Sequence, residues 1–201
     1  DNNNIPELQH IEGDTLRDDG ECPIDGFWIG LPRDREVLIN LEELDLSWHS
    51  CSAIPKQIRH LKNLKTFRFS KKRDGLQPPF MENADGLDEI EEIPDWIAEL
   101  ENLEELDLSN NKISCVPNVI GKLKNLKKLT HLRLIASGVG AAGAKSIAAA
   151  LKTLKNISVL DLGHNALGAS GAKHVVEAIK EFENLTELDL SGNGIGSVGV
   201  E

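Results

Sequence analysis

Leucine recurs along this chain in short segments that place it at positions one, four and six, with mostly polar residues between. The clearest copy runs from Leu103 to Asn111 and reads Leu-Glu-Glu-Leu-Asp-Leu-Ser-Asn-Asn. Such alternation predicts a β-strand with one buried face. Close copies begin at Leu41, Leu64, Leu129, Ile157 and Leu185. The chain is therefore an internal repeat, and each copy is expected to stack beside the next.

The segments between the first strands share a second pattern, Pro-x-x-Ile-x-x-Leu-x-Asn-Leu, as in residues 55–64. Proline suits the first position of a helix, and the Ile-x-x-Leu spacing places two apolar side chains on one face. A short helical turn is therefore expected opposite each strand. Leu41 and Leu64 lie 23 residues apart, as do Leu103 and Leu126. The pattern then slips by three residues, so that the next strand copy begins at Leu129.

One repeat is longer than its neighbours, because Leu64 and Leu103 lie 39 residues apart. The 16 extra residues fall near 71–90, a stretch that contains Gly75, Pro78-Pro79 and Gly86. These residues predict a loop rather than a strand. Loops of this length are usually functional or mobile.

The later repeats are longer in a regular way, with 28 residues from Leu129 to Ile157 and from Ile157 to Leu185. Their connecting segments, 144–154 and 172–182, carry one apolar stripe each and predict amphipathic α-helices. Three regions follow: a cap or degenerate repeat at 1–30, shorter repeats with the insertion at 31–128, and longer repeats at 129–201. The sequence ends where a helix is expected to begin, so we expect a fragment whose last strand has an unfinished apolar edge.

These motifs resemble the leucine-rich repeat family. The 23-residue copies are similar to its intracellular type and the 28-residue copies to its ribonuclease-inhibitor type, a mixture similar to that of bacterial effectors that enter host cells. The resemblance implies an α/β solenoid, a curved right-handed horseshoe arc with a concave parallel sheet and convex helices or helical turns. It also implies a ladder of asparagines, which is in doubt at His49, Lys72 and Ser137 because they replace asparagine.

The composition narrows the choice of partner and compartment. A formal charge of -11 and a pI of about 5.0 argue against nucleic acid and anionic membranes as partners. No apolar run is long enough to span a bilayer, so no membrane insertion is expected. The twelve acids between Glu82 and Asp107 occur without a base, which indicates either a solvated face or attraction for a basic partner.

The cysteines, Cys22, Cys51 and Cys115, are odd in number and far apart, which disfavours a disulfide framework or zinc site. The absence of a disulfide pattern favours a reducing compartment for this protein. We therefore expect a cytoplasmic protein, or one secreted into a host cell cytosol if it is a bacterial effector.

Residues 138–143 match the dinucleotide-binding pattern G-x-G-x-x-G. Residues 194–199 match it as well, and 166–171 keep its last two glycines. We therefore assign these glycines to the repeat, with one for the turn after the strand and one for close approach at the helix start. No cofactor is predicted.

The six histidines are scattered along the chain without metal-ligand spacing, and every candidate catalytic Ser or Asp is explained by the repeat. No metal site or enzyme activity is predicted. His131 and His164 are candidates to line the concave face, or are ordinary surface histidines.

Strand alternation places the third, fifth, seventh and eighth residues of each copy on the concave face. Acids dominate the third and fifth positions, but Arg68 and Arg133 interrupt them, so neighbouring Asp–Arg pairs are expected to neutralise part of the sheet. Trp48 stands out at an eighth position, because exposed Trp and Arg are common in binding hot spots; packing under a neighbouring loop is the alternative. The predicted partner-binding residues are Trp48, Arg68, Asp107, His131, Arg133, Asp161, His164 and Asp189.

The sequence thus predicts a non-enzymatic scaffold that binds a protein or peptide on its concave face, with a basic surface as one form of that partner. One alternative is the recognition arm of a larger effector enzyme, such as a ubiquitin ligase or a phosphatase-associated protein. Another is a GTPase regulator acting through Arg73. The pattern indicates no particular oligomeric state.

Overall fold

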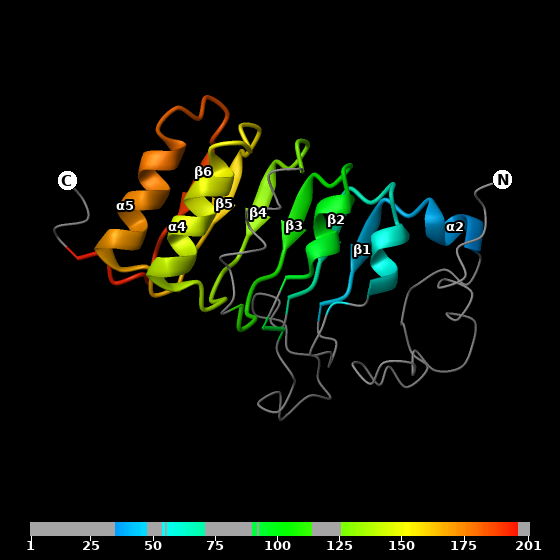
Figure 1. Ribbon diagram of the computed structural model, residues 1–201, viewed down its shortest axis with the longest axis horizontal. Helices are drawn as coiled ribbons and strands as arrows, with labels where there is room; N and C mark the ends of the chain where they lie inside the picture. Colours follow the sequence, from blue (N-terminus) through cyan, green and yellow to red (C-terminus); the bar gives the residue numbers. More distant parts are fainter. Residues whose placement is uncertain are drawn as a thin grey trace.

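The computed structural model describes residues 35–47, 54, 56–70, 90–91, 93–113 and 126–196. The predictions for residues 1–30, for Trp48 and Arg73 and for nearly all of the insertion fall outside these ranges. Six short strands form one parallel sheet in which each strand lies beside the next one in the chain (Figure 1). They are β1 (Glu43–Asp45), β2 (Thr66–Arg68), β3 (Glu105–Asp107), β4 (His131–Arg133), β5 (Val159–Asp161) and β6 (Glu187–Asp189).

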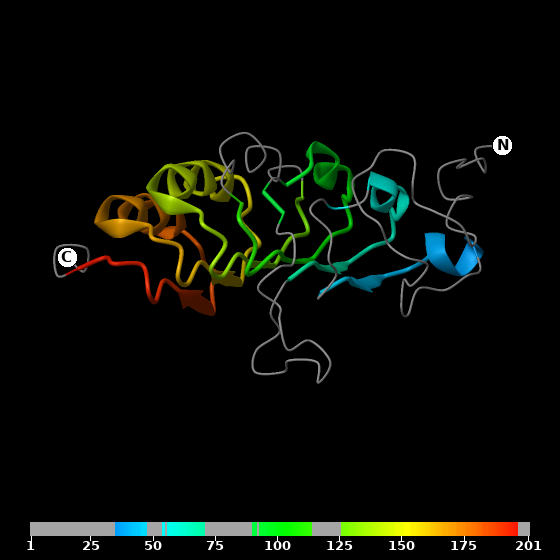
Figure 2. The same cartoon turned by 90° about the horizontal axis from the view of Figure 1, so that it is seen from below.

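The helices that follow the strands cover one face of the sheet, and the other face is the inner side of a shallow arc (Figure 2). An α-helix is about 10 Å wide, whereas neighbouring strands lie about 4.8 Å apart, so the sheet occupies the inner side. The α/β solenoid is confirmed. The helices are α2 (Arg35–Ile39), η1 (Lys56–His60), η3 (Asp95–Glu99), α4 (Gly140–Leu151) and α5 (Gly168–Ile179).

The type of helix between the strands changes along the chain, from short helical turns to α-helices, as predicted. Strands β1 and β2 are followed by the five-residue 3-10 turns η1 and η3, the second of them in the 39-residue repeat, and the 28-residue repeats carry the twelve-residue helices α4 and α5. Two details differ from prediction. Pro94 lies one residue before η3, as its extended N-cap, rather than inside it. Helix α4 begins at Gly140, earlier than the expected Ala144, and ends before Leu154.

The slip near Leu126 has a structural cause. In the sheet register Glu105 pairs with His131, so Leu129 begins the fourth strand segment. Leu126 instead takes the position of Leu100 in the preceding repeat, since its carbonyl accepts the N–H of the strand's first leucine. A strand segment that began at Leu126 would place His131 at its sixth position, which is leucine or phenylalanine in the other repeats and is buried in all of these except the last. The cost of burying His131 selects the observed register.

A ladder of buried asparagines links the turns that follow the strands. The Asn165 amide donates to the carbonyls of Leu134 and Leu162 at 2.6 and 3.0 Å, and its oxygen accepts the N–H of Ser137 at 2.8 Å. Asn193 makes the same set of hydrogen bonds one repeat later. At Ser137, where the ladder was in doubt, the hydroxyl donates to the Leu108 carbonyl at 3.0 Å and keeps the link. His49 and Lys72 lie outside the described residues.

Glycine permits the closest approach between repeats. A Cβ on Gly171 would lie 3.1 Å from the Cβ of Ala144 and 3.2 Å from the Cα of Ala141, so α4 and α5 pack with no room for a side chain. The predicted role of this glycine is confirmed.

At the far end of the described sheet, Leu188 is 42 % exposed, whereas its counterpart Leu160 is fully buried. Within the described residues, Leu188 is thus an exposed apolar side chain on the last strand. Among those residues, none of the helices combines the length and apolar character needed to span a membrane.

Candidate functional site

The concave face carries two straight rows of side chains, because the six strands pair in strict register. The third-position and fifth-position residues each lie directly opposite their counterparts on the next strand, as predicted. One row contains Glu43, Thr66, Glu105, His131, Val159 and Glu187. The other contains Asp45, Arg68, Asp107, Arg133, Asp161 and Asp189.

The aspartates of the fifth row have a structural task that the sequence analysis does not identify. Each accepts the backbone N–H two residues later, at 2.7 to 3.0 Å, and so closes the turn after its strand. Asp107, for example, accepts the N–H of Ser109 at 2.9 Å. Aspartate at this position is therefore explained in part by folding and is not by itself evidence of a partner.

Arginine at the fifth position cannot accept that hydrogen bond. In both arginine repeats a serine from the preceding repeat accepts it instead. The N–H of Ile135, after Arg133, donates to Ser109 Oγ at 3.2 Å, and the N–H of Ser70, after Arg68, donates to Ser47 Oγ at 3.4 Å. Several seventh-position side chains are thus partly or fully buried structural groups rather than open contact residues.

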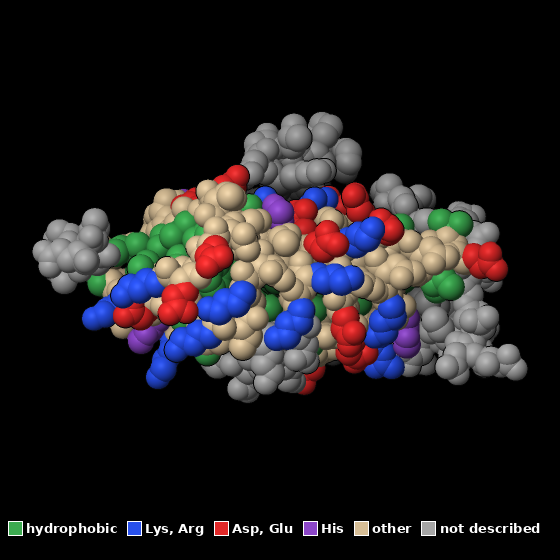
Figure 3. Space-filling model, turned by 90° about the horizontal axis from the view of Figure 1, so that it is seen from above, with side chains coloured by type: hydrophobic (Ala, Val, Ile, Leu, Met, Phe, Trp, Pro, Cys, Tyr) green, Lys and Arg blue, Asp and Glu red, His purple; other side chains and the backbone are tan. Residues whose placement is uncertain are grey.

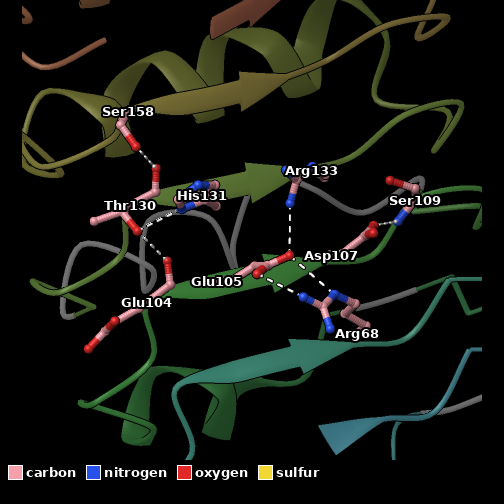
Figure 4. A network of polar contacts seen from close by, with 9 residues as sticks. All are labelled: Arg68, Glu104, Glu105, Asp107, Ser109, Thr130, His131, Arg133 and Ser158. Atoms are coloured by element: carbon pink, nitrogen blue, oxygen red, sulfur yellow. Dashed lines mark hydrogen bonds and ion pairs between the residues drawn. The ribbon is translucent and has the colours of Figure 1, made fainter. Parts of the chain in front are cut away.

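Glu105 lies between the two arginines and binds both (Figure 4). Its carboxylate accepts two hydrogen bonds from Arg68, at 3.2 and 2.9 Å, and one from Arg133 at 2.8 Å. Its side chain is only 19 % exposed. The sequence analysis expects aspartates to pair with these arginines, but the described ion pairs of both go to Glu105, because Arg68 and Arg133 reach across the row from either side. Glu105 is therefore the centre of the cluster, although it is not among the predicted site residues.

His131 is positioned by its neighbour in the chain. Thr130 Oγ1 lies 3.0 Å from the Glu104 carbonyl, to which it can donate as Ser158 and Thr186 do to the preceding repeat. The same oxygen lies 2.8 Å from His131 Nδ1 (Figure 4). Thr130 therefore links the His131 ring to the backbone of the preceding repeat.

Asp161 and Asp189 face each other on β5 and β6. The seventh residue of this repeat is Gly163, and the point where its Cβ would lie is 3.4 Å from Asp161 Oδ1, 3.4 Å from Asp189 Oδ2 and 3.5 Å from Ser191 Oγ. Burial raises the pKa of Asp161, and the neighbouring Asp189 acts in the same direction, whereas the Gly163 N–H and Arg133 lower it. Hydrogen bonds from Ser191 lower the pKa of Asp189.

His164 lies at an eighth position with a left-handed φ of 57°. Its ring rests against Gly192, where any side chain would collide with it. His164 stands at the eighth position of its repeat and His131 at the third, so the two do not lie in one row. The described residues hold no group of three His, Cys, Asp or Glu side chains that could bind a metal. Trp48, the predicted hot spot, lies outside the described residues.

The edge where the strands begin has a different character. Basic and acidic side chains are interspersed along it (Figure 3). Lys65 pairs with Glu42 at 2.7 Å, and Lys62 with Glu99 at 3.1 Å, all largely exposed. Exposed pairs of this kind contribute little energy, so this edge is a solvated surface.

A family model described as a leucine-rich repeat region matches residues 33–198. The chain belongs to the leucine-rich repeat family. Proteins of this family generally mediate protein–protein interactions through their repeats.

Individual relatives match only in part. A segment of 104 residues, 46 % of this chain, is 31 % identical to the flightless-1 homolog of Caenorhabditis elegans, and it spans only 8 % of that protein. The plant peptide hormone receptor RGFR1, solved in complex with RGF2, has a TM-score of 0.51 and 22 % identity over 82 % of this chain and 25 % of the receptor. An internalin of Listeria monocytogenes has a TM-score of 0.46 and 21 % identity over 80 % of this chain and 46 % of its own. RGFR1 shares the fold of this chain. The chain spans less than half the length of each of these three proteins.

Proposed function

We propose that this leucine-rich repeat protein is a non-enzymatic scaffold that binds a protein or peptide on its concave face. The observation that carries the proposal is the contrast between the two sides of each strand. The core side keeps Leu or Phe in every described repeat, whereas the concave rows differ from repeat to repeat. Stacking therefore determines the core, and the concave rows are available for recognition. RGFR1 in complex with RGF2 is an example of the same fold with a bound partner.

The test uses exposed concave residues that have no role in closing the turns. A Glu43→Lys/Glu187→Lys variant reverses charge at both ends of the third row. Its matched control, Glu177→Lys/Glu181→Lys, makes the same charge change on exposed positions of α5 and just after it. A partner isolated on the wild-type protein should bind the concave variant at least about tenfold more weakly and the control as well as wild type, measured by calorimetry. Equal binding to all three proteins contradicts the proposal.

A recognition arm of a larger effector enzyme stays the alternative proposal, and so does a GTPase regulator. The cytoplasmic or host-cytosol location also stays a prediction from the sequence.

A further inference from the structure

We propose that the concave face over β5 and β6 is a docking surface for a lysine side chain of a protein partner, and that Asp161, Asp189 and Ser191 bind its ammonium group. This inference rests on the proposed function, since it names the chemistry of the partner that the concave face binds.

The first argument is charge. Like charges directly opposite each other on neighbouring strands destabilise a sheet, yet Asp161 faces Asp189, and Glu187 faces the apolar Val159 beside them. The nearest described arginine, Arg133, lies one strand away and donates to Glu105. Within the described residues no Lys, Arg or His forms an ion pair with either aspartate. The central part of the concave face is thus neutralised internally, whereas its β5–β6 part is left acidic.

The second argument is geometry. In the other repeats the seventh position carries a serine or isoleucine side chain, but here it is Gly163. Oxygens of Asp161, Asp189 and Ser191 therefore border the space over Gly163, which holds no side chain. A bound cation would relieve the repulsion between the two carboxylates and offset the desolvation that raises the pKa of Asp161.

The third argument is the match between donors and acceptors. A lysine ammonium is compact and carries three N–H donors, which equals the number of converging oxygens. A guanidinium is planar and wider, and it prefers the two oxygens of one carboxylate. Asp161 and Asp189 each already use Oδ1 to accept a backbone N–H, so a compact donor suits the arrangement better.

The probe is the capped tripeptide acetyl-Gly-Lys-Gly-amide, titrated into the full chain while amide chemical shifts are followed by NMR. We expect saturable shifts at Gly163 and Ser191, weaker shifts with the arginine tripeptide, and none with the norleucine tripeptide. Asp189→Asn should weaken binding roughly tenfold, the loss of about one charge-assisted hydrogen bond. Gly163→Ser should do the same while the fold is kept, because serine is the common residue at this position and its hydroxyl can donate to the carboxylates. Asp45→Asn on β1 is the matched control, because Asp45 closes its turn in the same way, and it should bind as wild type.

Three outcomes would overturn the inference: equal shifts with norleucine, tighter binding of the arginine peptide, or unchanged affinity in both Asp189→Asn and Gly163→Ser. Saturation by calcium chloride with no response to the lysine peptide would also reject it in favour of an inorganic cation. Failure here leaves the Glu43→Lys/Glu187→Lys test untouched, because that test probes the concave face through residues outside the three-oxygen group.

Discussion

The backbone N–H of Ile135 donates to the side chain of Ser109, which belongs to the preceding repeat, at a distance of 3.2 Å. In the aspartate repeats the same N–H is accepted within its own repeat. The change to arginine at position 133 therefore depends on a serine one repeat earlier. The residue on the concave face and the residue that closes its turn are thus coupled across neighbouring repeats.

Ser109→Ala removes this acceptor and leaves the Ile135 N–H without its partner in a half-buried turn. We expect a loss of about 1 kcal/mol in the free energy of unfolding, measured by urea denaturation. Ser146→Ala is the control, because Ser146 lies on α4 with only a 3.5 Å contact to the Ala142 carbonyl, and alanine favours a helix. An equal effect of the two substitutions would show that the cross-repeat hydrogen bond contributes no stability.

Glu105→Gln removes the charge that binds both arginines but keeps the shape of the side chain. Arg68 and Arg133 are each about a third exposed, so water compensates part of the loss. We expect destabilisation of about 1–2 kcal/mol. Glu99→Gln breaks the exposed pair with Lys62 and should cost less than about 0.5 kcal/mol. Urea titrations of both variants test this difference, and a Glu105→Gln protein as stable as Glu99→Gln would refute the central role of Glu105.

Gly171→Ala would place a methyl group against Ala144 and the backbone of Ala141. Those atoms belong to the packed face of α4, so they must give way by a few tenths of an ångström. We expect a loss of about 1–3 kcal/mol, typical of overpacking, visible as a lower thermal midpoint. Ser170→Ala changes the exposed neighbouring position and should leave the midpoint unchanged or slightly higher. If Gly171→Ala left the thermal midpoint unchanged, the two helices would have room for a methyl group at this contact.

Much of the fold follows from local sequence pattern. The leucine spacing predicts the strands and their faces because burial alternates strictly with strand geometry. Glycine at 171 is predicted from its repeat position, since close helix packing recurs with the repeat. Leu129 rather than Leu126 begins the fourth strand because only that choice keeps His131 out of the core.

The candidate site is less accessible to such reasoning. Alternation places Arg68 and Arg133 on the concave face, but it does not show which nearby acid they bind, and the structure assigns Glu105 instead of an aspartate. The serine that replaces aspartate as acceptor lies a whole repeat away in sequence. The sequence alone shows that Gly163 is unusual, because the other seventh positions hold serine or isoleucine. The consequence of this glycine depends on three nearby oxygens that only the fold brings together.

The two facing aspartates predict opposite dependences on pH. The pKa of Asp161 is raised in the folded state, so its carboxylate opposes folding, and this penalty develops as pH rises above the ordinary value of 3.8. The pKa of Asp189 is lowered, so its contribution is present above 3.8 and is lost as pH falls through the folded-state pKa. Asp161→Asn should therefore gain stability relative to wild type as pH rises from 3 to 7, whereas Asp189→Asn should lose it. Asparagine keeps an oxygen acceptor for the turn N–H in both variants. Urea titrations at several pH values measure both slopes, and slopes of the same sign would contradict the assignment of Asp161 as the desolvated member of the pair.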